Sequence, residues 1–468
     1  MELTPLEIKV LEAIKPREEE YKLLLGTYER VASAVEAALR RHGITAEVTL
    51  QGSVAHDTWL SGDRDLDVFV LFPENWSRED LEKKALPILL EAAQQLGTCE
   101  LMYAEHPYVR LRTNGVEVDL VPGLKLRDPR EIKTAVDRTP FHTMYISKAL
   151  TREQRDHVRL LKKFMKAIGV YGAEVKTRGF SGYAVELLVA VFGSFRGVIE
   201  NASRWKPPVY VDTLGGGLTR QLKDTLARKY PDSCMYMPDP VDPERNVTAN
   251  VSLKSLATFI IASKCYLRNP GLEFFEEPPE PSISELLKAS EGRCLVFLVY
   301  NLREKLPPDV VWGEAQRVSL RLYRLLEVLG VKPVDYSAWT DESEVAVVAV
   351  ELETCRLPNY KHYRGPCIAH EDNRIHGFIS KHAGSGYGPW ITDDGCLESL
   401  DPRGTVDVAE VIESKWMEYT VAPHFRTVKP AVYTASKDLF EEIAQRGGGR
   451  WLRSFLLKAP HWMVKCTS

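Results

Sequence analysis

Residues 65–72 of this 468-residue chain read Asp-Leu-Asp-Val-Phe-Val-Leu-Phe, and the pair Gly52-Ser53 precedes them. The apolar run Val68–Phe72 predicts a buried strand. Asp65 and Asp67 are two residues apart, so they share one strand face, with Cα atoms about 6.6 Å apart. Aspartate is depleted from strands, and two carboxylates at this spacing suit metal ions about 3.5–4 Å apart, as used for in-line phosphoryl displacement. The alternative is a half-exposed edge strand with polar residues facing water.

A third carboxylate follows in residues 115–122, Gly-Val-Glu-Val-Asp-Leu-Val-Pro. The strict alternation predicts a half-buried strand with Glu117 and Asp119 on one face. Pairing with the first strand would bring Asp119 beside Asp65 and Asp67. Three acids there would hold two Mg²⁺ ions and orient a triphosphate and an attacking 3′-hydroxyl. Asp119 is the expected base for that hydroxyl, because it comes from a separate strand. The alternative is an ordinary amphipathic strand whose polar side chains face water, and Glu117 fits that alternative better than Asp119 does.

The composition, 44% hydrophobic and 27% charged, is ordinary for a globular protein. No apolar run reaches about 18 residues, so no transmembrane helix and no membrane partner are expected. The charged start, Met-Glu-Leu-Thr-Pro-Leu-Glu, is unlike a signal peptide. Eight cysteines stand singly without a Cys-x-x-Cys pair, which predicts reduced thiols in a cytoplasmic protein and argues against a cysteine-based zinc site.

Charge is unevenly distributed. The net charge is −4, yet residues 148–264 hold 19 Lys/Arg and 11 Asp/Glu. This basic middle predicts a phosphate-binding face, with a merely solvated basic helix as the alternative. Residues 446–468 carry five basic residues, no acid, and Trp451 and Trp462. That pattern suits contacts with RNA, and core packing of the two tryptophans fits equally well.

Periodicity predicts a multidomain α+β protein with three domains. Residues 1–146 form an α/β catalytic module, 147–268 a helical central domain, and 269–468 an α+β body and tail. Thr4, Pro5 and Glu7 predict a capped helix start. The other expected elements are helices over 24–39, about 78–97 and 314–329, and strands over 46–50, 295–300 and 344–352.

A set of motifs resembles archaeal-type (class I) CCA-adding enzymes, the tRNA nucleotidyltransferases that build the 3′-terminal CCA without a nucleic-acid template. The resemblance covers roughly residues 40–255, while the C-terminal third resembles the family only in layout. The motifs are G-S-V-A-H-D-T-W-L (52–60), D-L-D-V-F-V-L-F-P (65–73), A-E-H-P-Y (104–108), V-E-V-D-L-V-P (116–122), T-A-V-D-R-T-P-F-H-T (134–143), L-L-K (160–162), Y-G-A-E (171–174), R-G-F-S-G-Y (178–183) and D-P-E-R-N-V (242–247).

The resemblance implies a polymerase beta-like nucleotidyltransferase domain, Mg²⁺ as cofactor, CTP and ATP as substrates, the tRNA acceptor arm as partner, and a homodimer. It implies that Asp65, Asp67 and Asp119 are the catalytic, metal-binding carboxylates. It also implies nucleotide-binding roles for the following residues: Gly52, Ser53, Lys162 and Tyr171 at the triphosphate, His106, Thr139 and His142 near the ribose and phosphates, and Arg245 near the base.

One position departs from the family. Arginine usually stands three residues after the loop serine, where this chain has His56. Arginine is a permanent bidentate donor to phosphate, whereas histidine is a single donor that titrates near pH 6.5. A contact between His56 and the triphosphate is therefore a prediction. The alternative is that His56 faces away from the nucleotide and that another basic residue, such as Lys162, binds the triphosphate without it.

Two other functions share these features. A poly(A) polymerase or another RNA terminal nucleotidyltransferase has the same Gly-Ser and Asp-x-Asp core, and differs in which nucleotides it adds. A non-catalytic RNA-binding homologue would keep the scaffold, but the presence of all three carboxylates argues against it.

Overall fold

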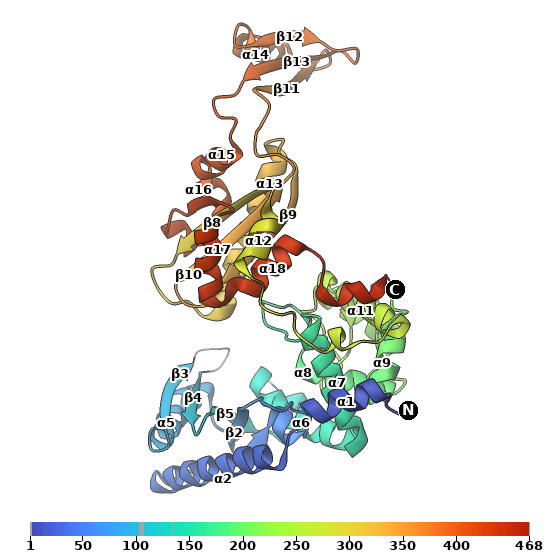
Figure 1. Cartoon of the computed structure of the whole chain (residues 1–468). Coiled ribbons are helices and arrows are strands. Elements are labelled where there is room, and N and C mark those ends of the chain that lie inside the picture. Colours follow the sequence, from blue (N-terminus) through green and yellow to red (C-terminus); the bar gives the residue numbers. More distant parts are fainter. Residues whose placement is uncertain (1, 103–106, 133, 468) are drawn as a thin grey trace. The chain divides into compact units, whose positions relative to one another are not determined.

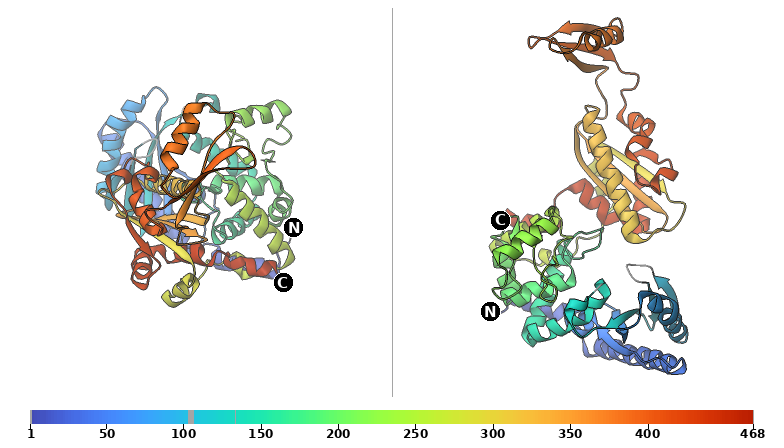
Figure 2. Two further views of the ribbon diagram at one scale, coloured as in Figure 1. Left: turned by 90° about the horizontal axis from the view of Figure 1, so that it is seen from above. Right: turned by 180° about the vertical axis from the view of Figure 1, so that it is seen from behind.

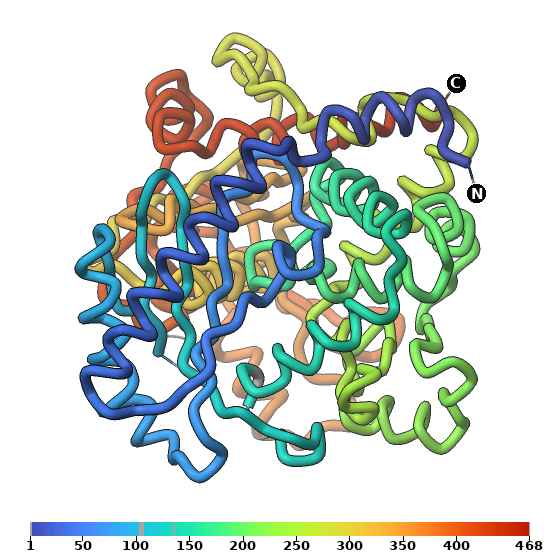
Figure 3. Tube along the Cα trace, turned by 90° about the horizontal axis from the view of Figure 1, so that it is seen from below, coloured from blue at the N-terminus to red at the C-terminus, as the bar shows by residue number. Residues whose placement is uncertain are grey.

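The computed structural model describes residues 2–102, 107–132 and 134–467. It divides into two compact units. Unit 1 comprises Met1–Pro278 with Pro460–Ser468, and unit 2 comprises Pro279–Ala459. Both chain termini lie at the same end of unit 1 (Figure 3). The predicted boundary between residues 146 and 147 falls inside unit 1 and stays a prediction.

Unit 1 begins with a mixed five-stranded sheet in the order β1-β2-β5-β4-β3. Strands β2 and β5 are parallel, and the other neighbours are antiparallel. One face of the sheet is apolar, and α2 and α5 cover it (Figure 1). The opposite face carries the polar residues of the alternating strands. The bounds are β1 Glu47–Gln51, β2 Asp65–Pro73, β3 Thr98–Met102, β4 Tyr108–Thr113, β5 Val116–Lys125, α2 Glu18–Arg41, α3 Gly52–Ala55, α4 Arg78–Asp80, η1 Leu81–Ala85 and α5 Leu86–Gln94.

The remainder of unit 1 is helical. The predicted capping box is confirmed, because Thr4 and Glu7 bond each other's backbone at the start of α1. A continuous core joins α1, α6 to α9 and α11, and Trp462 of the last segment is buried in it. The bounds are α1 Pro5–Ile14, α6 Ala135–Ala149, α7 Arg152–Ala167, α8 Gly182–Phe192, α9 Phe195–Ala202, β6 Val209–Tyr210, α10 Arg220–Lys229, β7 Met235–Tyr236, α11 Leu253–Arg268, and the short turns η2 Pro129–Glu131, η3 Leu272–Phe274 and η6 His461–Cys466.

Unit 2 contains an antiparallel sheet in the order β14-β8-β10-β9, across which α13 lies (Figure 2, right). All eight residues of β10 are buried, because helices cover both faces of the sheet. The predicted order of strand, helix and strand is confirmed by β8, α13 and β10, whereas β9 was not predicted. The bounds are α12 Ile283–Ser290, β8 Cys294–Asn301, α13 Pro308–Val328, β9 Pro333–Thr340, β10 Val345–Leu352, α15 Val408–Ser414, α16 Trp416–Tyr419, η4 Phe425–Thr427, β14 Ala431–Thr434, α17 Lys437–Ile443, η5 Ala444–Gly448 and α18 Gly449–Leu457.

Between β10 and α15, a small three-stranded sheet in the order β11-β13-β12 carries one helix, α14. Few of its residues are buried, among them His382, Cys396 and Ser399. The bounds are β11 Tyr360–Cys367, α14 Asp372–His382, β12 Tyr387–Ile391 and β13 Cys396–Pro402.

The prediction that all cysteines are reduced thiols is wrong. Six of the eight form disulfides, namely Cys265–Cys466, Cys294–Cys355 and Cys367–Cys396. The partners are 201, 61 and 29 residues apart, so spacing along the sequence gives no sign that the fold brings them together.

Among the described helices, none is long and apolar enough by itself to cross a membrane. Helices α8 and α9 reach that length only together, and a bend of 93° separates them.

Candidate active site

A row of polar residues crosses the open face of the unit 1 sheet. In register, Asp67 of β2 lies opposite Asp119 of β5 and, on its other side, opposite Gln51 of β1. Two residues earlier on the same strands, Asp65 of β2 lies opposite Glu117 of β5. Directly opposed residues on paired strands share a face, with Cβ atoms close together. The predicted strand pairing is therefore what the structure shows, and it puts the three predicted carboxylates on neighbouring positions of one sheet face.

The carboxylates disturb one another's ionisation. Burial raises the pKa of Asp67 to about 6, helped by the negative charges of Asp119 and Asp65 and opposed by the positive charges of His56 and Arg110. Burial also raises the pKa of Asp65, with Asp63, Glu117 and Asp119 adding to the effect. Acids held together against mutual repulsion are a donor set that fits a divalent cation. The side-chain carbonyl of Gln51 adds a buried acceptor without a hydrogen-bond partner among the described residues.

Asp67→Asn is expected to stabilise the metal-free protein at pH 7.5. The ordinary pKa of an aspartate is 3.8, and the folded protein raises that of Asp67 to about 6. The folded state therefore binds this proton more tightly than the unfolded state does, so stability is gained as pH falls through about 6 and lost as pH rises through it. The variant should gain about 1–3 kcal/mol at pH 7.5 and nothing below pH ~4.

Urea unfolding of unit 1 in EDTA across pH 4–8 measures this gain. Asp65→Asn, at a more exposed position, should show a smaller effect in the same direction. A loss of stability for Asp67→Asn at pH 7.5 would contradict the prediction.

Gly52 lies against the carboxylate face. Its φ is +69°, and a Cβ added there would overlap Oδ2 of Asp67. Both the left-handed backbone and the lack of space require glycine at this position. Ser53 follows in the first turn of α3, where its carbonyl accepts from the N–H of Thr58 at 2.9 Å. The Gly-Ser loop and the Asp-x-Asp strand thus pack directly together.

Behind this loop, buried Glu186 of α8 holds His56 and Lys162. Nδ1 of His56 lies 3.0 Å from both Glu186 oxygens, and Nζ of Lys162 lies 3.8 Å from Oε1. Burial raises the pKa of Glu186, but hydrogen bonds with His56 and the charges of His56 and Lys162 outweigh it, so the pKa is lowered. Burial lowers the pKa of Lys162, and the charge of Glu186 opposes this. Lys162 also donates to Oγ1 of Thr58 at 3.0 Å.

His56 has partners on both ring nitrogens. Its Nε2 lies 3.0 Å from Oγ1 of Thr143 on α6, and the residue is only 6% exposed. A direct contact between His56 and a triphosphate stays a prediction, and it requires that one of these two hydrogen bonds breaks.

Tyr171 lies next to Lys162. A Cβ added at Gly182, the first residue of α8, would be 3.1 Å from the hydroxyl oxygen of Tyr171 and 4.0 Å from Nζ of Lys162. Nζ of Lys166 stands 5.5 Å from the centre of the Tyr171 ring. Burial raises the pKa of Tyr171, so its hydroxyl is a donor at neutral pH. Two predicted triphosphate residues are therefore together.

A second buried carboxylate, Asp239, joins His142 and Arg245. Nε2 of His142 and Nη1 of Arg245 lie 2.7 Å and 3.0 Å from its Oδ2. Tyr183 donates to Oδ1 at 3.0 Å, and its ring stacks on His142 with centroids 3.9 Å apart. Burial raises the pKa of Asp239, but His142 and Arg245 are among the groups that outweigh it, so the pKa is lowered.

Two predicted residues are not placed in these clusters. Thr139 is half-buried on α6, one turn before Thr143. His106 lies outside the described residues.

Part of the basic middle, predicted to form a phosphate-binding face over residues 148–264, is buried on α7. Arg159 and Lys162 are 1% and 2% exposed, so neither is on the surface. Arg159 pairs with Asp57 and Asp156, and its Nε donates to the carbonyl of Trp59 at 3.0 Å. These bonds tie α7 to the segment after the Gly-Ser loop, because a buried guanidinium must have partners for its donors.

Arg110 is a site residue that was not predicted from the sequence. It stands on β4 opposite Asp119, and its Nε and Nη2 donate to Oδ1 and Oδ2 of Asp119 at 2.8 and 2.9 Å. Among the described residues, no three His, Cys, Asp or Glu side chains converge closely enough to form a ready metal site.

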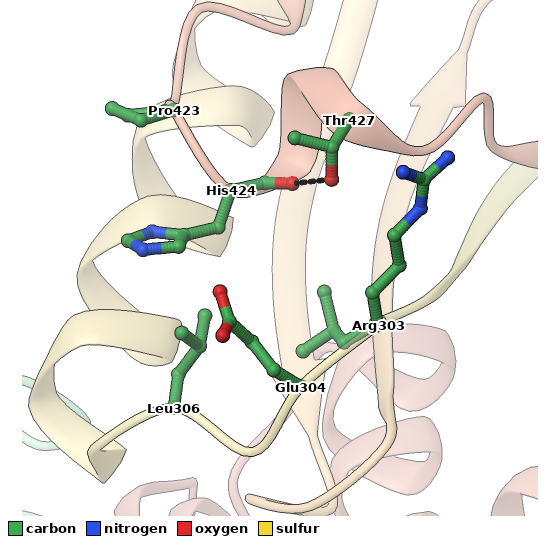
Figure 4. A pocket seen from close by; sticks show the side chains of 7 residues that line it. Arg303, Glu304, Leu306, Pro423, His424 and Thr427 are labelled. Carbon is green, nitrogen blue, oxygen red and sulfur yellow. Dashed lines mark hydrogen bonds between the residues drawn. The ribbon is translucent and has the colours of Figure 1, made fainter.

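The pocket in Figure 4 belongs to unit 2, not to the carboxylate face. Its volume is about 130 Å³, below the ~300 Å³ of small ligand sites. Thr427 donates to the carbonyl of His424 at 2.7 Å, and Nδ1 of His424 lies 2.7 Å from Oε1 of buried Glu314. It is lined by Leu302, Arg303, Glu304, Leu306, Pro423, His424 and Thr427.

The sheet and its carboxylate face define a nucleotidyltransferase, and the family described as nucleotidyltransferase domain matches residues 31–142. Two further families match, "tRNA nucleotidyltransferase, second domain" over residues 156–276 and "CCA-adding enzyme, C-terminal domain" over residues 291–428. Nucleotidyltransferases use divalent metal ions, as the donor set here also indicates.

Named relatives identify the particular family. The CCA-adding enzyme of Saccharolobus islandicus (strain M.14.25 / Kamchatka #1) is 40% identical over 427 residues, which is 89% of this chain and 96% of that protein. The CCA-adding enzyme of Sulfurisphaera tokodaii is 37% identical over 458 residues, 98% and 99% of the two chains. The chain belongs to the CCA-adding enzymes, which confirms the resemblance and the fold class.

Among solved structures, a mutant of the Cid1 poly(U) polymerase bound to MgATP aligns with a TM-score of 0.46 at 18% identity. The alignment covers 58% of this chain and 98% of that one, and it is too distant to bear on function.

Proposed function

We propose that this protein adds CCA to the 3′ end of tRNA, using CTP and ATP and releasing diphosphate. The observation that carries the proposal is the register of Asp67 with Asp119 beside Asp65, in a chain of the CCA-adding family. No other described part of the molecule presents three acids on neighbouring register positions beside a Gly-Ser loop.

Asp65, Asp67 and Asp119 would hold Mg²⁺, which when bound stabilises negative charge on the triphosphate and activates the attacking hydroxyl. Asp119 would accept the proton of the 3′-hydroxyl, because it lies on a different strand from the other two acids. Gly52 leaves room for the nucleotide by keeping side-chain atoms away from Asp67.

The two buried carboxylates organise nucleotide binding. Glu186 keeps Lys162 charged in a buried place, next to the hydroxyl of Tyr171, where both would donate to phosphate oxygens. Asp239 fixes His142 and Arg245 relative to one another, so that they would contact the ribose and base. The roles of Ser53, His106 and Thr139 remain as the resemblance implies.

For tRNA, we propose contacts through shape and phosphates, since A-form grooves hide base edges from side chains. A hollow of about 570 Å³ is lined by β11 and by α14 with the turn before it. Two of its basic residues, Arg374 and Lys381 of α14, have no ion-pair partner among the described residues. The basic tail is less favourable for RNA, because Arg446, Arg450, Lys458 and Lys465 pair with acids of the chain. Its RNA contact stays a prediction.

Affinity for tRNA is expected to fall steeply as salt rises from ~50 to ~200 mM, because bound counterions are released. Arg374→Ala with Lys381→Ala should lower the slope of log affinity against log salt by about 1–2, roughly one for each phosphate that is no longer neutralised. Filter binding measures this slope. Lys429→Ala, an exposed lysine of unit 2 paired with Glu413, is the matched control and should leave the slope unchanged. An unaltered slope in the double variant would exclude the hollow as an RNA site.

The function itself is tested with a tRNA that lacks its 3′ CCA, supplied with CTP and ATP together and singly. A CCA-adding enzyme incorporates two C and one A and then stops. Continued addition of A alone would favour a poly(A) polymerase, and no incorporation with retained tRNA binding would favour a non-catalytic homologue.

We also propose that the protein is a homodimer in the cytoplasm. Cytoplasmic proteins rarely contain disulfides, but those of hyperthermophilic archaea and bacteria are an exception, and the three disulfides here fit that exception.

A further inference from the structure

The polar row on the sheet does not end at the acids. In register it runs from Gln51 through Asp67 and Asp119 to Arg110 of β4. Arg110 is 23% exposed and Asp119 24%, so their pairing is partly shielded from water. Nη2 of Arg110 is also 3.1 Å from the hydroxyl of Tyr108, and Nε is 3.1 Å from Oε1 of Glu117. The hydrogen bonds with Asp119 raise the pKa of Arg110, whose charge is permanent.

The guanidinium group of Arg110 donates to both carboxylate oxygens of Asp119, and this two-pronged contact is called the fork below. A bidentate guanidinium–carboxylate pair fixes the plane of the carboxylate as well as its position. The same two oxygens are those that a metal ion would need from Asp119. That overlap fits the finding that the described acids do not converge on a ready metal site.

We infer that Arg110 is a positioning residue that supplies positive charge beside Asp119 when no metal is bound: it holds Asp119 in the metal-free enzyme and shares it with the metal when the metal binds. The inference rests on the proposed function. It predicts two opposite effects of removing the arginine. Metal should bind more tightly, because a competing cation is gone, while the reaction should slow, because Asp119 is no longer oriented.

The neighbouring pair provides a matched control. Arg112 stands on the same face of β4 and is opposite Glu117, with Nε donating to Oε2 at 3.2 Å. It repeats the cross-strand pairing of Arg110 with Asp119 further along the hairpin, without a proposed metal ligand. Arg112→Gln therefore tests whether the loss of any arginine–carboxylate pair on this sheet face changes metal affinity, or only the loss of the pair with Asp119.

The experiment titrates the metal-free enzyme with Mn²⁺ in the absence of nucleotide and tRNA, reading free Mn²⁺ by electron paramagnetic resonance. Arg110→Gln should bind Mn²⁺ about 3- to 30-fold more tightly than wild type, whereas Arg112→Gln should match wild type. With tRNA and CTP, Arg110→Gln should lose about 10- to 100-fold in kcat. Mn²⁺ affinity of Arg110→Gln that is equal to or weaker than wild type overturns the inference.

Arg110→Lys keeps the charge and loses the fork, so it provides a second readout if Arg110→Gln does not fold. Its Mn²⁺ affinity should stay at the wild-type value while kcat falls, and an unchanged kcat would overturn the positioning role. The Mn²⁺ titration requires no substrate. Failure of the wild type to add CCA would therefore count against the proposed function alone, and the metal readout would stand by itself.

Discussion

Changing Asp65, Asp67 or Asp119 to Ala is expected to lower kcat at least ~10³-fold, because charge stabilisation by the metal is worth several kcal/mol in the transition state. The three acids stand on neighbouring positions of two paired strands, so the loss of any one leaves an incomplete set of metal ligands. Binding of tRNA should survive, since none of them carries the positive charge that phosphates need.

Single-turnover incorporation of CTP into a tRNA lacking its 3′ end measures this loss. Glu117→Gln is the matched control, because Glu117 shares the strand and the face with Asp119 and pairs with Arg112. It should keep most of the activity. Retained turnover in Asp119→Ala, with tRNA in excess, would remove Asp119 from the catalytic set.

Changing Glu186 to Ala is expected to destabilise unit 1 by about 3–5 kcal/mol, the cost of leaving buried cations without their partner. Among the described residues, Lys162 would then keep only Thr58 as a hydrogen-bond partner, in a place where burial already lowers its pKa. The lysine should lose its proton at a lower pH than in wild type. A neutral lysine binds the triphosphate less tightly, so the affinity for CTP should fall.

Glu186→Gln removes the negative charge of this side chain and keeps its size, so it tests the role of the charge alone. It should fold, and its KM for CTP should begin to rise at a lower pH than that of wild type, because the pKa of Lys162 is lowered further, while kcat changes little. Urea unfolding and KM measured across pH report the two effects. Glu200→Gln, at a partly exposed glutamate of α9 paired with Arg196, should change neither. A Glu186→Gln enzyme with the wild-type KM profile would show that Glu186 does not support Lys162.

The carboxylate face was predictable because its signals are local. Alternation within β2 and β5 determines which side chains share a face, and burial of the other face determines which face is polar. Arg110 was equally predictable and was missed. Asn114-Gly115 forms a two-residue turn with positive φ at both residues, and such a turn determines the pairing on either side, so Arg110 opposite Asp119 follows from the sequence.

Glu186 and Asp239 were not predictable in this way. His56 and Glu186 are 130 residues apart, and His142 and Asp239 are 97 apart, so their meeting depends on how helices pack. An acid within an apolar helix gives no indication of its partner. The same reason explains the wrong prediction for the cysteines, and the buried Arg159 on a helix that looks basic from its sequence alone.

The disulfide between Cys265 and Cys466 has a consequence for the covalent connectivity of the protein. The chain leaves unit 1 after Pro278 and returns at Pro460, so this bond encloses all of unit 2 within one covalent ring. The bonds Cys294–Cys355 and Cys367–Cys396 form two smaller rings inside it. A protease cut anywhere in unit 2 therefore leaves the two fragments joined, and they separate on a denaturing gel only after reduction.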